Sequence, residues 1–177
     1  DEQRNRLYVV TREDKQFYTF DLSSKKIISK LGLDAEAYDC KIGKGGKELY
    51  ITCWGCDKVL VYDLEKSMWK SPIIVGDNPN EILVTKDGKY LYVCNANDNS
   101  VSVVDLATRR VIETLDAALF PNSPSGSTTN SLAYDQVNKR LYIANANNNC
   151  LAVFDVSTPG KSVAKGFVPV GWYPTSV

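Results

Sequence analysis

Two cysteines separated by two residues form the motif in this chain that is closest to a reactive or metal-binding site, Cys53-Trp54-Gly55-Cys56. A zinc site needs four ligands, and the chain has no second Cys pair at suitable spacing and no His. A thioredoxin-like thiol needs a helix N-terminus, whereas this motif lies between two alternating, strand-like runs. We therefore predict structural cysteines, free or locally bridged, and no catalytic residue, metal site or cofactor.

Four aspartates at equivalent positions could be mistaken for a catalytic set: Asp21, Asp63, Asp105 and Asp155. Each follows a Leu by fourteen residues and is itself followed by Leu or Val. A catalytic centre is needed once, whereas an architectural residue recurs in every unit. We therefore predict that each carboxylate caps a turn by accepting main-chain N–H bonds.

Asparagine is concentrated in two segments, Asn95 to Asn99 and Asn145 to Asn149. Asn tolerates left-handed backbone angles and bonds to its own main chain in tight hairpins, which is a structural explanation. Its carbonyl oxygen could also serve a hard cation, but a calcium site wants several carboxylates and only Asp98 is present here. No metal is predicted.

The composition excludes several classes of function. Lys plus Arg and Asp plus Glu number 21 each among 177 residues, so the formal net charge is zero and nucleic acid is not a favoured partner. No apolar run approaches the length of a membrane-spanning helix, so no membrane insertion is expected. The first residues, Asp1 to Arg6, are charged and polar, so we expect any signal peptide to be absent or already removed.

The elements that would position these residues repeat along the chain. A Leu-Tyr pair occurs at Leu7, Leu49, Leu91 and Leu141, with spacings of 42, 42 and 50 residues. Four short apolar or alternating runs, separated by Gly, Asn, Asp and Lys, make up the best-defined unit, from Asn80 to Asp116. A period in the forties with four strands per unit is typical of a β-propeller.

The predicted fold is therefore all-β, a propeller of four-stranded antiparallel blades in one partial domain over residues 1–177. The repeats run over about 1–36, 37–78, 79–128 and 129–177, and Pro174 to Val177 would begin a further inner strand. The first repeat lacks its inner strand. Two arrangements satisfy this pattern: a closed four-bladed ring, or an arc of a larger propeller.

Several motifs resemble the YVTN, or YncE-like, family of β-propeller repeats. The third unit matches at Pro79, Asp87-Gly88, Tyr92 to Asn95 and Val103 to Asp105; the fourth matches at Tyr142 to Asn145 and Val153 to Asp155. The first and second units depart from the pattern, with Thr11 and Cys53 in place of Asn. The resemblance implies an exported protein with a propeller of about seven blades, which favours the arc.

Two further segments, Asn145 to Asp155 and Pro169 to Thr175, are similar to the propeller half of bacterial proteins that join a YncE-like propeller to an alkaline-phosphatase-like domain. One hypothesis from this resemblance is an accessory propeller of a phosphoesterase whose catalytic domain lies outside this chain. A propeller lactonase is disfavoured by the absence of His and of a carboxylate cluster on the predicted inner strands.

The main hypothesis is a non-catalytic binding or scaffold module of a periplasmic, extracellular or cell-surface protein. In a propeller, the loops between the second and third strands share one face with the connections to the next blade. We expect this rim to meet a protein or carbohydrate partner, and the blades to pack with further blades or a second chain. The candidate rim residues are Trp54, Asn95, Asn97, Phe120, Asn145, Asn147, Trp172 and Tyr173.

The opposite edge would collect basic side chains and is interpreted as a solvated face. It comprises Lys44, Lys47, Lys86, Lys89, Lys139, Arg109 and Arg110.

Overall fold

Antiparallel sheets account for nearly all of the regular structure in a computed structural model that describes residues 1–177. The first sheet has three strands, β1 (Arg6–Val10), β2 (Gln16–Asp21) and β3 (Lys26–Gly32). The second has four, β4 (Glu36–Ile42), β5 (Glu48–Trp54), β6 (Lys58–Asp63) and β7 (Met68–Ile74).

The third and fourth sheets repeat the four-stranded pattern. The third contains β8 (Pro79–Val84), β9 (Tyr90–Asn95), β10 (Ser100–Asp105) and β11 (Arg110–Asp116). The fourth contains β12 (Thr129–Asp135), β13 (Arg140–Asn145), β14 (Cys150–Asp155) and β15 (Val163–Pro169). Two short 3₁₀ turns, η1 (Lys44–Gly46) and η2 (Ala146–Asn148), complete the elements. No helix is long and apolar enough to cross a membrane.

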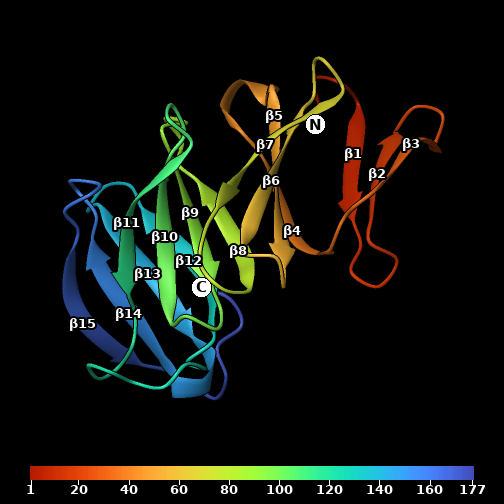
Figure 1. The fold of residues 1–177 in the computed structure, drawn as a ribbon. Coiled ribbons are helices and arrows are strands. Elements are labelled where there is room, and N and C mark those ends of the chain that lie inside the picture. The colour runs from red at the N-terminus through yellow and green to blue at the C-terminus, as the bar shows by residue number, and fades with distance from the viewer.

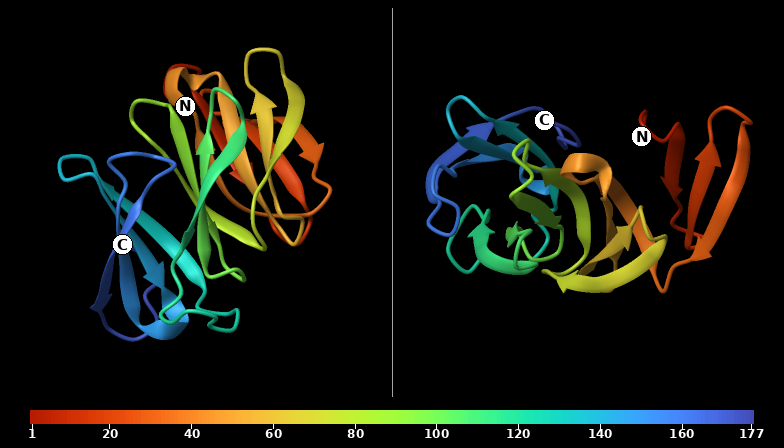
Figure 2. Two further views of the ribbon diagram at one scale, coloured as in Figure 1. Left: turned by 60° about the vertical axis from the view of Figure 1, so that its left-hand side comes forward. Right: turned by 90° about the horizontal axis from the view of Figure 1, so that it is seen from above.

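Each sheet is a meander in which consecutive strands are hydrogen-bonded neighbours (Figure 1). The sheets follow one another along an arc, with the first sheet, in red, at one end and the last, in blue, at the other (Figure 2). The inner strands β4, β8 and β12 contact one another in that order. The predicted propeller blades are confirmed, and they form an open arc of the kind found in part of a larger propeller.

Pairing with the neighbouring strand sets where some strands begin. Strand β4 begins at Glu36, which pairs with Trp54 of β5, and β7 begins at Met68, which pairs with Asp63 of β6. Residues 174–177 form no strand; the amide of Val177 donates to Ser131 Oγ (3.2 Å) beside β12. The edge of β1 has no strand partner.

The Leu-Tyr pair shows how the blades are held together. Successive side chains on a strand point to opposite faces, so Leu91 packs toward the second sheet while Tyr92 packs toward the fourth. Leu49 and Tyr50 divide in the same way between the first and third sheets. Each of the three apolar clusters therefore lies between two neighbouring blades, and none lies within a single sheet.

A buried asparagine also joins neighbouring blades. In β9, Asn95 Oδ1 accepts from the amide of Gly76 (3.2 Å), which belongs to the connection leaving the second sheet. Its Nδ2 donates to Ser100 Oγ and Ser102 Oγ (2.9 Å each). The equivalent Asn145 donates to the carbonyl of Ala117 (2.7 Å), on the connection leaving the third sheet. The side chain of this Asn therefore links one blade to the connection that precedes it by hydrogen bonds.

The four repeated aspartates cap turns, as predicted. Asp21 accepts from the amide of Ser24 (2.6 Å), Asp63 from that of Lys66 (2.8 Å), Asp105 from that of Thr108 (2.9 Å) and Asp155 from that of Ser157 (3.1 Å). Their recurrence follows from the recurring turn between the third and outer strands.

Replacing Asn95 by Ala should lower the free energy of unfolding by about 2–3 kcal/mol, because buried donors and acceptors on two blades would lose their partners. Urea unfolding at an unchanged m-value measures this loss. The matched control is Asn97→Ala, which removes an exposed side chain two residues away and should change stability by less than about 0.5 kcal/mol. Equal losses of stability at the two positions would contradict a stabilising role for the hydrogen bonds of Asn95.

Truncating the leucine of the repeated Leu-Tyr pair should distinguish blade faces that a neighbouring blade covers from faces that are exposed. Leu49→Ala should cost about 3 kcal/mol of unfolding free energy, because Leu49 is buried between the first two sheets. Leu7→Ala should cost less than about 1 kcal/mol, because Leu7 is 48% exposed on the free face of the first sheet. Thermal and urea unfolding of both variants provide the comparison; a large loss at Leu7 would mean that this face is covered in solution.

Candidate functional site

The rim forms because each hairpin between a blade's second and third strands is bonded to the connection that leaves the same blade. The bonds run from the amide of Leu33 to Lys15 O (2.7 Å), Val75 to Asp57 O (3.0 Å), Ala117 to Asn99 O (2.8 Å) and Val170 to Asn149 O (2.9 Å). All four acceptors have left-handed backbone angles, with φ between 51° and 52°. This repeated bond brings the hairpins and connections together on one face, which we call the rim.

The eight candidate rim residues differ in what they can offer a ligand. Asn95 and Asn145 are buried and bonded within the protein, so the fold uses their side chains. Asn97 and Asn147 are exposed, and Asn147 Nδ2 bonds to Gly126 O (2.5 Å) and Thr128 Oγ1 (2.8 Å). The left-handed asparagines of the two hairpins are Asn99 and Asn149.

The aromatic candidates lie at separate places on the rim. Phe120 is 67% exposed in the connection between β11 and β12, and Trp172 is 91% exposed after β15. Tyr173 has a left-handed φ of 49°, and its amide donates to Asn149 Oδ1 (2.8 Å). None of these three rings is in an aromatic pair, whereas Trp54 is.

Trp54 belongs to the one stacked aromatic pair in the chain. Its ring lies 5.5 Å from that of Tyr38, at an interplanar angle of 22°. The guanidinium carbon of Arg12 lies 5.7 Å from the centroids of both rings, in cation–π geometry. Arg12 also pairs with Glu36 (3.5 Å), so the cluster is electrically balanced. The sequence prediction named Trp54 but missed Tyr38, Arg12 and Glu36, because they come from other strands and another blade.

Polar side chains extend this cluster across the inner strands. The hydroxyl of Tyr38 donates to Asn130 Oδ1 (3.5 Å), and Asn80 Nδ2 donates to the same oxygen (3.2 Å). These three residues come from β4, β8 and β12, the inner strands of the second, third and fourth blades. The rim therefore joins an aromatic pair to a row of amides that follows the inner strands.

The long connection between β11 and β12 is braced against the hairpins. Asn99 Oδ1 accepts from the amides of Gly126 (2.9 Å) and Ser127 (2.6 Å), and Asn99 Nδ2 donates to Pro124 O (2.9 Å). Asn148 Nδ2 donates to Ser127 Oγ (2.7 Å). The Asn-rich hairpins thus hold this connection in place, which is a structural use for much of their Asn content.

Two carboxylates, Asp39 and Glu81, lie on neighbouring inner strands, although no larger group of acidic side chains gathers there. Asp39 on β4 accepts from the amide of Ile82 on β8 (3.3 Å), and Glu81 precedes Ile82. Burial raises the pKa of Glu81, and the negative charge of Asp39 adds to the effect, while the Ser131 hydroxyl opposes it. The pair was missed because 42 residues separate its members in the sequence.

The five cysteines are all free thiols in this structure. Cys53 is buried, and its neighbour Cys56 donates from Sγ to the carbonyl of Cys53 (3.3 Å). Burial, followed by the contact with Cys56, raises the pKa of Cys53 to about 12. A thiol with a raised pKa is a poor nucleophile at neutral pH, so the structure supports the structural interpretation of Cys53 over a reactive one.

Comparison with known proteins places the chain among propellers. The chain is 29% identical over 121 residues to the antigen Lp49 of Leptospira interrogans, an alignment that covers 60% of this chain and 26% of that protein. It is 28% identical over 142 residues to the protein YncE of Salmonella typhi, with 77% of this chain and 40% of YncE covered. The chain thus spans less than half the length of these relatives.

Two solved structures share the fold of this chain. The dihydro-heme d1 dehydrogenase NirN superposes with a TM-score of 0.75 at 16% identity, covering 96% of this chain and 36% of NirN. The hydrazine synthase of Kuenenia stuttgartiensis superposes with a TM-score of 0.61 at 18% identity, covering 97% of this chain and 73% of that one. At these identities the likeness concerns the fold alone.

A family model described as "Lactonase, 7-bladed beta-propeller" matches residues 40–174, which is more than half of the chain. The match begins within β4, extends past β15 and includes most of the second blade and the complete third and fourth blades. The chain therefore belongs to the seven-bladed lactonase-type family of β-propellers, with relatives of the YncE type.

Proposed function

We propose that this chain is a non-catalytic binding module of an exported or surface protein, and that its rim binds a carbohydrate. The observation that carries the proposal is the stacked Tyr38–Trp54 pair with Arg12 over both rings. Flat aromatic faces beside a few fixed polar groups are typical of small-molecule and sugar recognition. Asn130 and Glu36 supply such groups at this position.

The charge balance of the cluster favours a neutral ligand. Arg12 is matched by Glu36, and the chain as a whole has no net charge. A single-stranded nucleic acid would need a basic groove beside the aromatic rings. A polyhydroxylated sugar needs only ring faces and hydrogen-bonding side chains, which are both present. A protein partner on the same rim is the alternative occupant.

The proposed export has a separate basis. It rests on the resemblance of the third and fourth units to exported YVTN-type repeats. Fractionation of cells that express the full-length parent protein would test it, and recovery of the protein only in the cytoplasmic fraction would reject it.

Carbohydrate binding should depend on Trp54 and not on Trp172. In calorimetric titrations with a panel of oligosaccharides, Trp54→Ala should weaken binding by at least about tenfold, because the stacking surface is removed. Trp172→Ala is the matched control: it removes an isolated, fully exposed indole and should change affinity less than about twofold.

Three outcomes would reject the proposal or move the site. Loss of binding in Trp172→Ala alone would place the ligand beside β15. Equal losses in both variants would indicate non-specific association with aromatic side chains. If no oligosaccharide binds while a protein partner is captured through Trp54, carbohydrate recognition is wrong.

A second candidate function, lactone hydrolysis, is favoured by the family and by the Asp39 and Glu81 pair on the inner strands. A carboxylate with a raised pKa can act as a general base near neutral pH. It would take a proton from water as the oxygen attacks the lactone carbonyl, and the ring C–O bond would then break with return of the proton to the leaving oxygen.

If this second function holds, Glu81→Gln should lower the rate of lactone hydrolysis by about 100-fold or more, because the base is removed. The readout is proton release from simple γ- and δ-lactones, with Glu36→Gln as the control, since Glu36 is a β4 carboxylate paired with Arg12. Hydrolysis no faster than in buffer, or an equal rate in Glu81→Gln, would exclude Glu81 as a catalytic base.

A further inference from the structure

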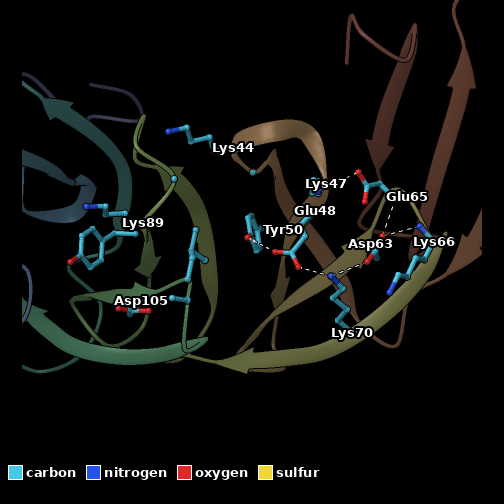
Figure 3. Close-up of a pocket in the computed structure, with 15 residues that line it drawn as sticks. Lys44, Lys47, Glu48, Tyr50, Asp63, Glu65, Lys66, Lys70, Lys89 and Asp105 are labelled. Carbon is cyan, nitrogen blue, oxygen red and sulfur yellow. Dashed lines mark hydrogen bonds and ion pairs between the residues drawn. The ribbon is translucent and has the colours of Figure 1, made fainter.

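A cleft of about 670 Å³ lies between the second and third sheets, on the face opposite the rim (Figure 3). Its walls come from the turns that join inner to second strands and third to outer strands in both blades. They include Lys44, Lys47 and Lys66 from the second blade and Lys89 from the third. The sequence predicts a solvated edge for Lys44, Lys47 and Lys89, and the structure gathers them around a cavity.

The carboxylates of the cleft are already occupied by the protein. Glu48 accepts from the hydroxyl of Tyr50 (2.7 Å), Lys70 Nζ (2.8 Å) and Arg109 Nη2 (2.5 Å), the last reaching across from the third blade. Burial acts to raise the pKa of Glu48, but the bonds from Lys70 and Tyr50 outweigh it and lower the pKa. Glu48 is therefore a fixed ionised group in the wall.

Asp63 is held in the same network. Lys70 Nζ lies 2.8 Å from its Oδ2, and this bond, with the amides of the following turn, lowers the pKa of Asp63 to about 2. Of the other two carboxylates, Glu65 pairs with Lys47 (3.8 Å) and Asp105 caps the turn at Thr108. In Figure 3, dashed lines link Tyr50, Glu48, Lys70 and Asp63 in one chain.

Three lysines of the cleft have no carboxylate within ion-pair distance: Lys44, Lys66 and Lys89. Lys44 crosses from the second blade to the third, where its Nζ donates to the carbonyl of Asp87 (3.2 Å). A Cβ at Gly88 would lie 2.4 Å from Lys44 Cβ, so the glycine makes room for this crossing. Asp105 also has no cationic partner, so the charged groups left unpaired in the cleft are three ammonium groups and one carboxylate, and the balance is positive.

We propose that this cleft binds a small soluble polyanion, of the class of phosphorylated small molecules. Its volume is in the usual range for small-molecule sites, and its lining is mostly polar and charged. Lysine is a common phosphate ligand and acts as a flexible point charge. The Glu48 network fixes the wall between the two blades, so that the free ammonium groups line a preformed space.

A polymer such as a nucleic acid is a poorer match for the same chemistry. The chain carries no net charge, and the three unpaired lysines of this cleft surround one cavity instead of following a groove. The proposal therefore commits to a discrete small anion.

Pyrophosphate is the probe, titrated calorimetrically into the whole chain at constant ionic strength. We expect saturable binding by the native protein and at least about tenfold weaker binding by Lys44→Gln combined with Lys89→Gln, because two free cations are lost. The control combines Lys86→Gln with Lys139→Gln, which line the neighbouring cleft of about 440 Å³ between the third and fourth sheets. It should change affinity less than about twofold.

Several results would overturn the proposal. These are an absence of saturable heat with the native protein, equal weakening in the two double variants, or tighter binding of a twelve-nucleotide single strand than of pyrophosphate. Circular dichroism checks that the variants fold. If the double variant does not, Lys89→Gln alone decides, because Lys89 makes no side-chain bond or ion pair; an unchanged affinity in that variant would reject the site.

Discussion

The alternation of side chains along each strand is the constraint on which this structure depends. A single four-stranded sheet has two apolar faces and cannot bury either one alone. The Leu-Tyr pair makes this visible, because Leu91 and Tyr92 enter different clusters on opposite sides of the third sheet. The apolar clusters therefore lie between blades, and each blade depends on the neighbours that cover its faces.

This constraint explains what the sequence could predict. The strands and turns are local, so β-branched runs, the Asp-Gly turn and the spacing of Asp105 from Leu91 were enough to locate them. Interactions between blades join residues that are some twenty to sixty positions apart, and local patterns in a single sequence do not predict such contacts. Asn95 was interpreted as a hairpin residue, yet its side chain bonds to Gly76 of the previous connection. The Tyr38–Trp54 pair and the bond from Arg109 to Glu48 were missed for the same reason.

Repeated and unrepeated residues have different physical meanings here. The four aspartates cap a turn that recurs in each blade, and the buried Asn95 and Asn145 bond to main-chain groups of the preceding connections. These side chains therefore have structural roles. Trp54 stands one position after Cys53, where the third and fourth blades have the buried Ala96 and Ala146. Departure from the repeat therefore marks the position at which a side chain is released from a structural role.

The chemistry of the turns also separates the two faces of the arc. On the rim, the residue before each third strand must adopt a left-handed backbone, and in the later blades Asn99 and Asn149 do so while their side chains fasten the adjoining connections. These two side chains are thus bonded within the protein, whereas the rings of Phe120 and Trp172 are exposed on the same rim. On the opposite face, lysines occupy several turns, and their long side chains reach across the space between blades. Lys44 does so over Gly88, and no carboxylate lies within ion-pair distance of it, because Lys70 and Arg109 already pair with Glu48.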